Sequence, residues 1–187
     1  MKKFELTNEF ITNMFGTKLF RIRALVEFGD VEAGELGGYV EKESNLGHDD
    51  NAWVYDNAWV YGNARVYGDA QVSGDARVYG NARVYGNAWV YGNAWVYGNA
   101  LVCSDEDYAY AHGFGSVNRT TTFFRLKDGG VGVRCGCFYG TLAQFRDKIR
   151  ETHGETKKAQ EYLMLADLME LRFEEDENEV GNRKYVE

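Results

Sequence analysis

The sequence contains no proline, although average usage of about 5% would place about nine in a chain of this length. Every backbone nitrogen can therefore donate a hydrogen bond, as an architecture rich in β ladders requires. Cysteine is scarce and odd in number, with three residues, which argues against a disulfide scaffold. A run of about 18 apolar residues is also absent, so no membrane-spanning helix is predicted.

Positive charge is in deficit. The chain carries 21 Lys and Arg against 29 Asp and Glu, a net charge of −8, which disfavours duplex nucleic acid as a partner of the whole chain. This balance leaves room for a local basic patch. The first residues, MKKF, include no apolar signal core, and together with the odd number of cysteines they predict a cytoplasmic protein.

The abundant feature is a six-residue repeat. Nine hexads follow one another without an insertion over residues 51–104, from NAWVYD through NARVYG and DAQVSG to NALVCS. Ala and Val at the second and fourth places alternate with a variable residue and usually Tyr, which indicates a short strand with Ala and Val pointing inward. Gly followed by Asn or Asp then makes a corner, because these residues tolerate a positive φ.

Two folds can use this unit. Nine tiny strands joined by Gly-Asn hairpins would form an antiparallel meander, but that sheet would leave one apolar face uncovered. A coil of three hexads per turn buries the same face inside itself, with Ala at the corners and Val filling the sides. Because a hexapeptide period is also a known sign of β-helices, we favour the coil.

Written from its Val, the unit resembles the hexapeptide repeat of left-handed parallel β-helices, with an aliphatic residue first and a small residue fifth, as in VYDNAW at 54–59. The resemblance implies a mainly β protein with a left-handed coil, an exception to the usual right-handed crossover. It implies no single activity, because this superfamily includes acyltransferases, carbonic anhydrases and non-catalytic proteins.

The flanks predict atypical ends, which a solenoid needs to cover its open core. We expect strands at 3–7, 9–14 and 19–25, an irregular first coil at 36–46 and a hairpin from Thr120 to Cys135. Thr141 and Thr156 are predicted to cap two helices, which end at His153 and at about Phe173. The second helix would bury one stripe, formed by Ala159, Tyr162, Leu163, Ala166 and Leu171.

The expected divisions are an N-terminal β cap (1–35), the β-helix (36–104), an α+β segment ending in two helices (105–173) and an acidic tail (174–187). The flanks also resemble phage- and prophage-encoded hexapeptide-repeat proteins, in the segments LGGYVEKESNL (36–46), TTFFRLKDG (121–129), CGCFYGTLAQF (135–145) and RETHG (150–154). This second resemblance implies a setting, the cytoplasm of an infected host, and no mechanism.

Stacking residue i on residue i+18 gives the coil three faces, with rungs about 4.8 Å apart. The variable positions then form one ladder per face: Trp53, Gln71 and Trp89 on the first face, Trp59, Arg77 and Trp95 on the second, and Arg65, Arg83 and Leu101 on the third. All four Trp lie in the outer coils, so the central coil (69–86) is a polar belt between aromatic shelves.

Such an aromatic surface predicts an interface or a binding groove. One interpretation is subunit packing, in which the ladders fill the seams of a homo-oligomer with a trimer as the favoured count. The other is a ligand site in those seams. Aromatic planes for a base and guanidinium groups for phosphate are what a nucleotide needs.

The short side chains of Gln71 and Ser73 predict a notch flanked by Trp53 and Trp89. Arg77 can stack on its neighbouring Trp rings and still offer its fork to an anion. The candidate ligand-binding residues are Trp53, Gln71, Ser73, Trp89, Trp59, Arg77, Trp95, Arg65, Arg83 and, in a loop, Arg119. In the competing interpretation, Asp69, Asp75 or a neighbouring subunit neutralises the arginines, including the like charges on neighbouring rungs of the third face.

Catalysis has little support in the sequence. Acyl transfer or carbonic anhydrase chemistry needs histidine in the coil, whereas His48, His112 and His153 all lie outside the hexads. His48 stands beside two aspartates, which allows a His–Asp pair or a solvated turn. The CGC run at 135–137 lacks the CxxC spacing of metal and redox sites, so we expect no metal and no cofactor.

We therefore expect a non-catalytic binding protein, an oligomer that captures a small anionic, nucleotide-like ligand at subunit seams. In a phage setting this activity would sequester a host immune signalling nucleotide. Two other hypotheses stay open: a hexapeptide-type acyltransferase and a purely structural assembly module.

Overall fold

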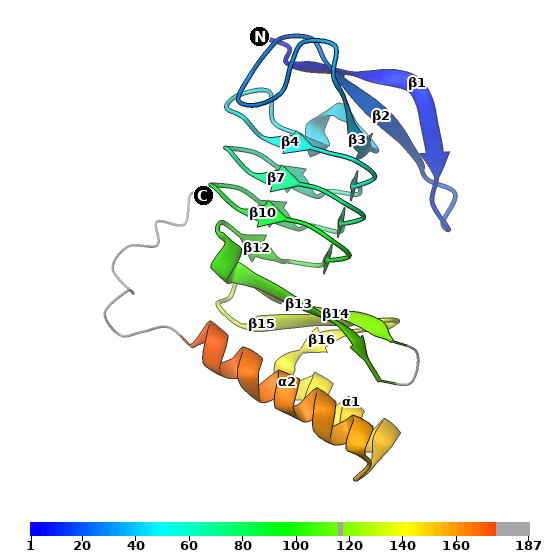
Figure 1. Cartoon of the computed structure of the whole chain (residues 1–187), viewed down its shortest axis with the longest axis vertical. Helices are drawn as coiled ribbons and strands as arrows, with labels where there is room; N and C mark the ends of the chain where they lie inside the picture. The colour runs from blue at the N-terminus through cyan, green and yellow to red at the C-terminus, as the bar shows by residue number, and fades with distance from the viewer. Residues whose placement is uncertain (116–117, 175–187) are drawn as a thin grey trace.

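The repeat folds into the expected coil. The computed structural model describes residues 1–115 and 118–174, and Figure 1 shows the rungs of the coil stacked between an N-terminal β cap and a C-terminal sheet with two helices. Each hexad gives one two-residue strand: β4 (Trp53–Val54), β5 (Trp59–Val60), β6 (Arg65–Val66), β7 (Gln71–Val72), β8 (Arg77–Val78), β9 (Arg83–Val84), β10 (Trp89–Val90), β11 (Trp95–Val96) and β12 (Leu101–Val102).

Every strand pairs in parallel with the strand 18 residues away. The first face is the sheet β10-β7-β4, the third face is β12-β9-β6, and the second face, β5-β8-β11, belongs to a longer sheet. The pairs Trp53↔Gln71, Trp59↔Arg77 and Arg65↔Arg83 lie in register. The parallel β-helix and its three ladders are therefore confirmed.

The core of the coil is a column of small side chains. Ala and Val of the first eight hexads have no exposed surface. Glycine closes the corners with φ between +63° and +73° from Gly62 to Gly98, and the rungs are so close that a Cβ on Gly80 would lie 3.0 Å from the backbone nitrogen of Gly98. Glycine is required at that corner for both its φ and its lack of a side chain.

The N-terminal cap extends the second face. It consists of β1 (Phe4–Thr12) and β2 (Lys18–Ala24), which β3 (Leu36–Val40) of the first coil joins to this face, so that β1-β2-β3-β5-β8-β11 makes one six-stranded sheet. The prediction of two strands within 3–14 was wrong. One strand spans this stretch, because an irregularity between Leu6 and Phe10 absorbs the extra residues without ending the ladder with β2.

The irregular first coil expected at 36–46 is confirmed. β3 pairs in parallel with β5, and Leu46 bridges to Val66 on the third face. Between them, a short 3-10 turn at Glu43–Asn45 makes the corner. The buried Asn45 side chain replaces missing backbone partners there, because its Nδ2 donates to the carbonyls of Gly62 (3.2 Å) and Ala64 (2.8 Å).

The other end of the coil is closed by an antiparallel sheet. After a 3-10 turn at Asp105–Asp107 its strands are β13 (Tyr108–Phe114), β14 (Arg119–Arg125), β15 (Val131–Cys135) and β16 (Phe138–Thr141). The hairpin predicted at 120–135 is β14 and β15, whereas β13 and β16 were not predicted. Adjacent residues of β14 face opposite ways, with Phe124 in the core of the coil and Phe123 in the core against the helices.

Both predicted helices are present, α1 (Leu142–His153) capped by Thr141 and α2 (Lys157–Phe173) capped by Thr156. The stripe predicted on α2 is partly wrong, because Leu171 is 67% exposed and Leu163 is only partly buried. The buried face follows the helical spacing onto Met169 and Phe173. No helix within the described residues is both long and apolar enough to cross a membrane. Of the predicted acidic tail, 175–187 lies outside the described residues.

A buried ion pair joins the coil, the sheet and the helices. Asp107 accepts backbone hydrogen bonds from Cys103 (2.9 Å) and Ser104 (3.2 Å), and its other oxygen lies 3.2 Å from Nε of Arg125. Arg125 in turn donates to the carbonyl of Phe173 at the end of α2. Because both charged groups are almost fully buried, removing either one would leave the other uncompensated.

The first prediction concerns the glycines at the corners of the coil. Gly80 and Gly129 both have a positive φ, but a Cβ on Gly129 would meet nothing within 4 Å. We expect Gly129→Ala to lower the free energy of unfolding by about 1 kcal/mol through φ strain alone. Gly80→Ala should lower it by at least about 1 kcal/mol more, because the next rung must also shift. Urea denaturation measures both, and equal losses would contradict the rung-to-rung contact.

The cap generates the second prediction. The Lys3 side chain is buried, and its Nζ donates to the carbonyls of Asp50 (3.1 Å) and Ala52 (2.8 Å). Burial lowers the pKa of Lys3 to about 8. Between that pH and its ordinary pKa of 10.5, the unfolded chain binds more protons than the folded chain, so the free energy of unfolding gains a contribution that rises with pH.

Lys3→Met removes this contribution. We subtract the free energy of unfolding of Lys3→Met from that of the wild type, both measured by urea denaturation at each pH. We expect this difference to become more positive from pH 7 to pH 10. The comparison between variants cancels the titration of the other groups. A difference that stays constant over this range would show that burial does not depress the pKa of Lys3.

Candidate functional site

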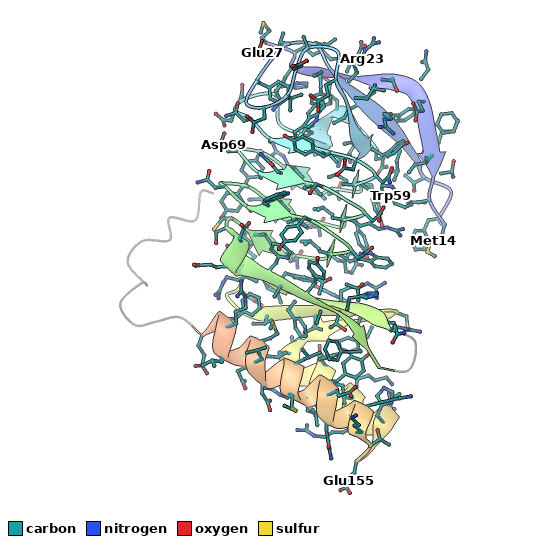
Figure 2. All side chains as sticks on the ribbon, in the orientation of Figure 1. Met14, Arg23, Glu27, Trp59, Asp69 and Glu155 are labelled. Atoms are coloured by element: carbon teal, nitrogen blue, oxygen red, sulfur yellow. The ribbon has the colours of Figure 1, made fainter. Side chains whose placement is uncertain are left out.

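A groove runs over the second face of the coil, between the tip of the β1–β2 hairpin and the C-terminal sheet. Figure 2 shows Met14 at the tip of this hairpin and Trp59 on the same side of the molecule. The groove has a volume of about 460 Å³. Its lining residues are Thr12, Asn13, Met14 and Phe15 from the hairpin tip, Trp59, Tyr61, Arg77, Tyr79, Trp95 and Tyr97 from the coil, and Arg134, Cys137 and Tyr139 from the C-terminal sheet.

Arg77 lies at the centre of this groove, between two indole rings. Its guanidinium carbon is 4.1 Å from the ring centroid of Trp59 and 4.7 Å from that of Trp95. Across the described residues, this guanidinium forms neither an ion pair nor a hydrogen bond. The two rings flank the guanidinium, and its N–H groups, which have no acceptor among the described residues, are left to bind an anion.

A second cation enters from the C-terminal sheet. Arg134 of β15 lies with its guanidinium carbon 5.3 Å from the Trp95 ring centroid. Its Nε donates to the Tyr79 hydroxyl (3.2 Å) and its Nη1 to the carbonyl of Phe138 (2.9 Å), so both acceptors are neutral. The position of this side chain is therefore fixed while its charge is not neutralised.

A ladder of tyrosines forms the other part of the groove floor. The rings of Tyr61 and Tyr79 stack at 4.8 Å, those of Tyr79 and Tyr97 lie 4.4 Å apart, and Tyr139 meets Tyr97 edge to face. Burial raises the pKa of Tyr61 to about 12 and also raises that of Tyr139. These two hydroxyls are thus neutral at physiological pH, and the arginines give the groove its charge.

A smaller cavity of about 300 Å³ continues the groove toward the corner that precedes each strand. It shares Arg77, Trp95 and Arg134 with the groove, and its other lining residues are Asp75, Asn93, Arg119, Thr120 and Gly136. Arg119 packs directly on Gly136, where a Cβ would lie 1.8 Å from Nη1 of the arginine. Three arginines and one aspartate therefore surround this cavity.

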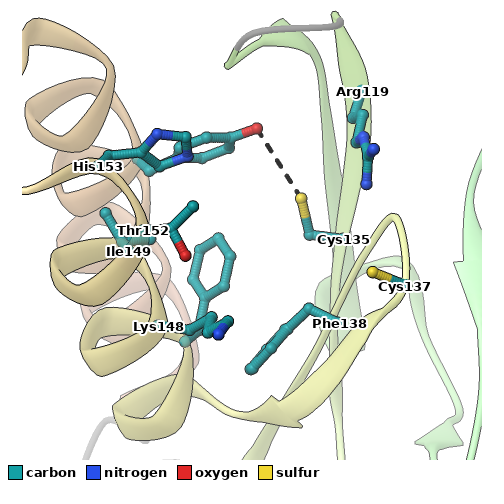
Figure 3. Close-up of a pocket in the computed structure, with 10 residues that line it drawn as sticks. Arg119, Cys135, Cys137, Phe138, Lys148, Ile149, Thr152 and His153 are labelled. Carbon is teal, nitrogen blue, oxygen red and sulfur yellow. Dashed lines mark hydrogen bonds between the residues drawn. The ribbon is translucent and has the colours of Figure 1, made fainter.

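A third cavity of about 240 Å³ lies between α1 and the C-terminal sheet, and Arg119 and Cys137 also line it (Figure 3). The Cys135 thiol lies 3.2 Å from the Thr121 hydroxyl and 3.9 Å from the Tyr162 hydroxyl, the contact drawn as a dashed line. Burial raises the pKa of Tyr162 to about 12. Within residues 1–115 and 118–174, no three His, Cys, Asp or Glu side chains are grouped to hold a metal ion.

The structure brings together only part of the predicted site. Trp59, Arg77, Trp95 and Arg119 line the groove and the cavity beside it. Arg65 and Arg83 lie in register on the third face, away from the groove. No carboxylate in the described part of the chain pairs with them, and the alternative partner Asp69 instead accepts from Asn51 (2.8 Å).

The notch predicted on the first face lacks one of its expected walls. Trp53 is fully buried, because the cap packs Phe4 and Phe28 against its indole with ring centroids 6.2 Å and 5.3 Å away. On the other side, Nε1 of Trp89 donates to the Ser73 hydroxyl at 2.9 Å, one rung from Gln71. The expectation that Trp53 faces a ligand was therefore wrong.

Sequence reasoning missed the residues that the two ends contribute, above all Asn13 and Arg134. The alternation along β15 signals that Arg134 faces away from the buried Val133, but no pattern indicates which face of the coil it meets. Asn13 is buried beside the groove. Its Oδ1 accepts from the backbone of Phe15 and Thr17, while its Nδ2 has no acceptor among the described residues.

The histidines occupy three separate places. His48 pairs through Nε2 with Glu43 at 2.9 Å and accepts at Nδ1 from the backbone of Lys3, so the His–Asp pair considered from the sequence is not formed. The hydrogen bonds from Lys2 and His48 lower the pKa of the Glu43 carboxyl. His112 contacts the Thr120 hydroxyl at 2.9 Å, and the ring of His153 stacks on Tyr162.

Comparison with known proteins matches the coil alone. Residues 58–74, 70–84, 76–92 and 82–98 match the family model described as the YdcK β-solenoid repeat, and together these stretches span less than half of the chain. A search of curated proteins finds no match. The coil is thus similar to a β-solenoid repeat family, and this similarity assigns no activity to the groove.

Proposed function

We propose that the protein binds, without transforming it, a small anionic, nucleotide-like ligand in the groove of the second face. The observation that carries the proposal is the guanidinium of Arg77, which is held between two indole rings with no carboxylate partner in the described residues. A guanidinium that is flanked by rings and lacks a carboxylate partner can bind an anion that fits against those rings.

The rest of the lining supports a ligand that combines a ring with an anion. Stacked tyrosines and two indoles provide flat apolar surfaces for a base, a mode of binding that tolerates different bases. Arg77 and Arg134 provide the positive charge, and the Nδ2 of Asn13 is a donor that lacks an acceptor.

The proposal places the site within one chain. The lining residues of the groove come from the cap, the coil and the C-terminal sheet of one chain. On the resemblance of the flanks to phage-encoded proteins, we propose that the captured ligand is a host immune signalling nucleotide, which the protein removes from solution in the cytoplasm of the infected cell.

The third prediction tests binding. Isothermal titration with ribonucleoside mono-, di- and triphosphates should reveal at least one ligand, and Arg77→Gln should weaken it about 10- to 100-fold through loss of charge-assisted hydrogen bonds. Arg83→Gln is the matched control, because it makes the same change at the same hexad position on the third face. The bound ligand should also protect the exposed, groove-lining Cys137 from a maleimide.

Two results would contradict the proposal. The first is the absence of binding for every nucleotide at millimolar concentration. The second is an equal loss of affinity in Arg77→Gln and Arg83→Gln, which would place the ligand outside the groove. Circular dichroism of both variants establishes that the coil is intact before the affinities are compared.

We further propose that the first face forms the subunit interface of a homotrimer. Trp89 and Tyr91 are 49% and 45% exposed, and their rings lie 5.4 Å apart, so they form an aromatic patch beside the short side chains of Gln71 and Ser73. Rings that remain this exposed in one protomer are typical of interfaces.

The fourth prediction concerns this interface. Sedimentation velocity should show a trimer for the wild type and a monomer for the double variant Trp89→Ser, Tyr91→Ser. The control is Met164→Ser, Leu168→Ser on the exposed face of α2, where both side chains also face solvent. A wild-type monomer, or dissociation only in the α2 variant, would overturn the assignment of the interface to the first face.

A further inference from the structure

We infer that the ligand carries two or more linked phosphate groups at one end, as in a nucleoside diphosphate or triphosphate, and that this end lies among Arg77, Arg119 and Arg134. The inference rests on the proposed function and specifies the chemistry of the ligand and its direction in the groove. It follows from how charge is distributed along the groove and from how each arginine is held.

The charge lies at one end only. The residues that line the larger groove and not the smaller cavity include no acidic or basic side chain, and burial keeps the hydroxyl of Tyr61 neutral. Arg77 and Arg134 stand where the groove and the cavity join, and Arg119 and Asp75 line only the cavity side. The ring of a ligand therefore fits over the tyrosines, and its anionic part fits toward Arg119.

The net charge of the residues that line the cavity indicates how much negative charge a ligand should bring. Three guanidinium groups and one carboxylate give the cavity a net charge of about +2. In the described part of the chain, Arg77 and Arg119 have no hydrogen-bond or ion-pair partner, and Arg134 bonds only to neutral oxygens. Mutual repulsion of these cations is relieved by a ligand with two or more negative charges, whereas a cyclic monophosphate brings only one. A terminal monophosphate brings nearly two, so the preference for a diphosphate over a monophosphate depends on the reach of its oxygens.

Contacts within the protein position the side chains of Arg77 and Arg134. Two indole rings flank Arg77, and two hydrogen bonds fix Arg134 and leave its Nη2 unused. The exposed Arg119 lies against Gly136 at the edge of the cavity. Donors that are already in place lose little conformational entropy on binding and favour a ligand that engages all of them. Pyrophosphate oxygens, unlike a single phosphodiester, can reach several of these donors together.

The test is a series of ligands that differ only in phosphate number. Isothermal titration of the full-length protein with AMP, cyclic AMP, ADP and ATP, and with the guanine and uracil counterparts, should show ADP and ATP binding at least tenfold tighter than AMP and cyclic AMP for the base that binds best. Inorganic pyrophosphate should compete at lower concentration than inorganic phosphate. Arg119→Gln should weaken the diphosphate about tenfold and leave the monophosphate within about twofold.

The outcomes separate this inference from the proposed function. Binding that is independent of phosphate number, or an Arg119→Gln variant that weakens monophosphate and diphosphate equally, overturns the inference and leaves nucleotide capture standing. Absence of binding for every nucleotide overturns both. Arg83→Gln, which removes a cation from the third face, should leave the whole series unchanged and thereby excludes a general effect of net charge.

Discussion

The structure depends on one constraint, the stacking of each residue on the residue 18 positions away. Ala and Val of the hexads fill the column inside the coil, the other side chains of each hexad lie outside it, and the parallel register aligns those side chains in ladders. The rung spacing of a β-sheet, about 4.8 Å, is close to the distance at which flat groups stack. A guanidinium inserted between two indoles on the second face is thus a direct result of the backbone register, and needs no special loop to hold it.

The same constraint explains what could be predicted from the sequence. The coil, its three faces and the neighbours of Arg77 follow from the period, because a repeat fixes contacts between residues that are distant in sequence. The ends do not repeat, and their positions depend on packing that no periodicity encodes. Trp53 therefore looked like an exposed ladder residue, although Phe4 and Phe28 cover it, and Arg134 was overlooked, although it lies against Trp95.

Charge is distributed unevenly over the molecule, which the net charge alone does not reveal. The chain has a net charge of −8, yet the cavity beside the groove is lined by three arginines and one aspartate. The acidic surplus lies elsewhere, because residues 1–50 carry ten Asp and Glu against six Lys and Arg, and residues 174–187 carry six against two. A negative protein with a positive groove repels polyanions such as duplex nucleic acid from most of its surface and still attracts a small anion to one place. The buried Asp107–Arg125 pair has a different role, because it fixes the sheet that delivers Arg134.

The six-stranded sheet that runs from β1 to β11 has a geometric consequence. The hairpin tip is attached to the top of this sheet through β2 and β3, while Tyr139 and Arg134 belong to the sheet that closes the bottom of the coil. The span of the groove is therefore counted in rungs. A chain with one more coil of three hexads would open the same groove by about 4.8 Å, and a chain with one coil fewer would close it by as much. A duplication or deletion of 18 residues would therefore change the length of the groove by one rung and leave the stacking within each rung as it was.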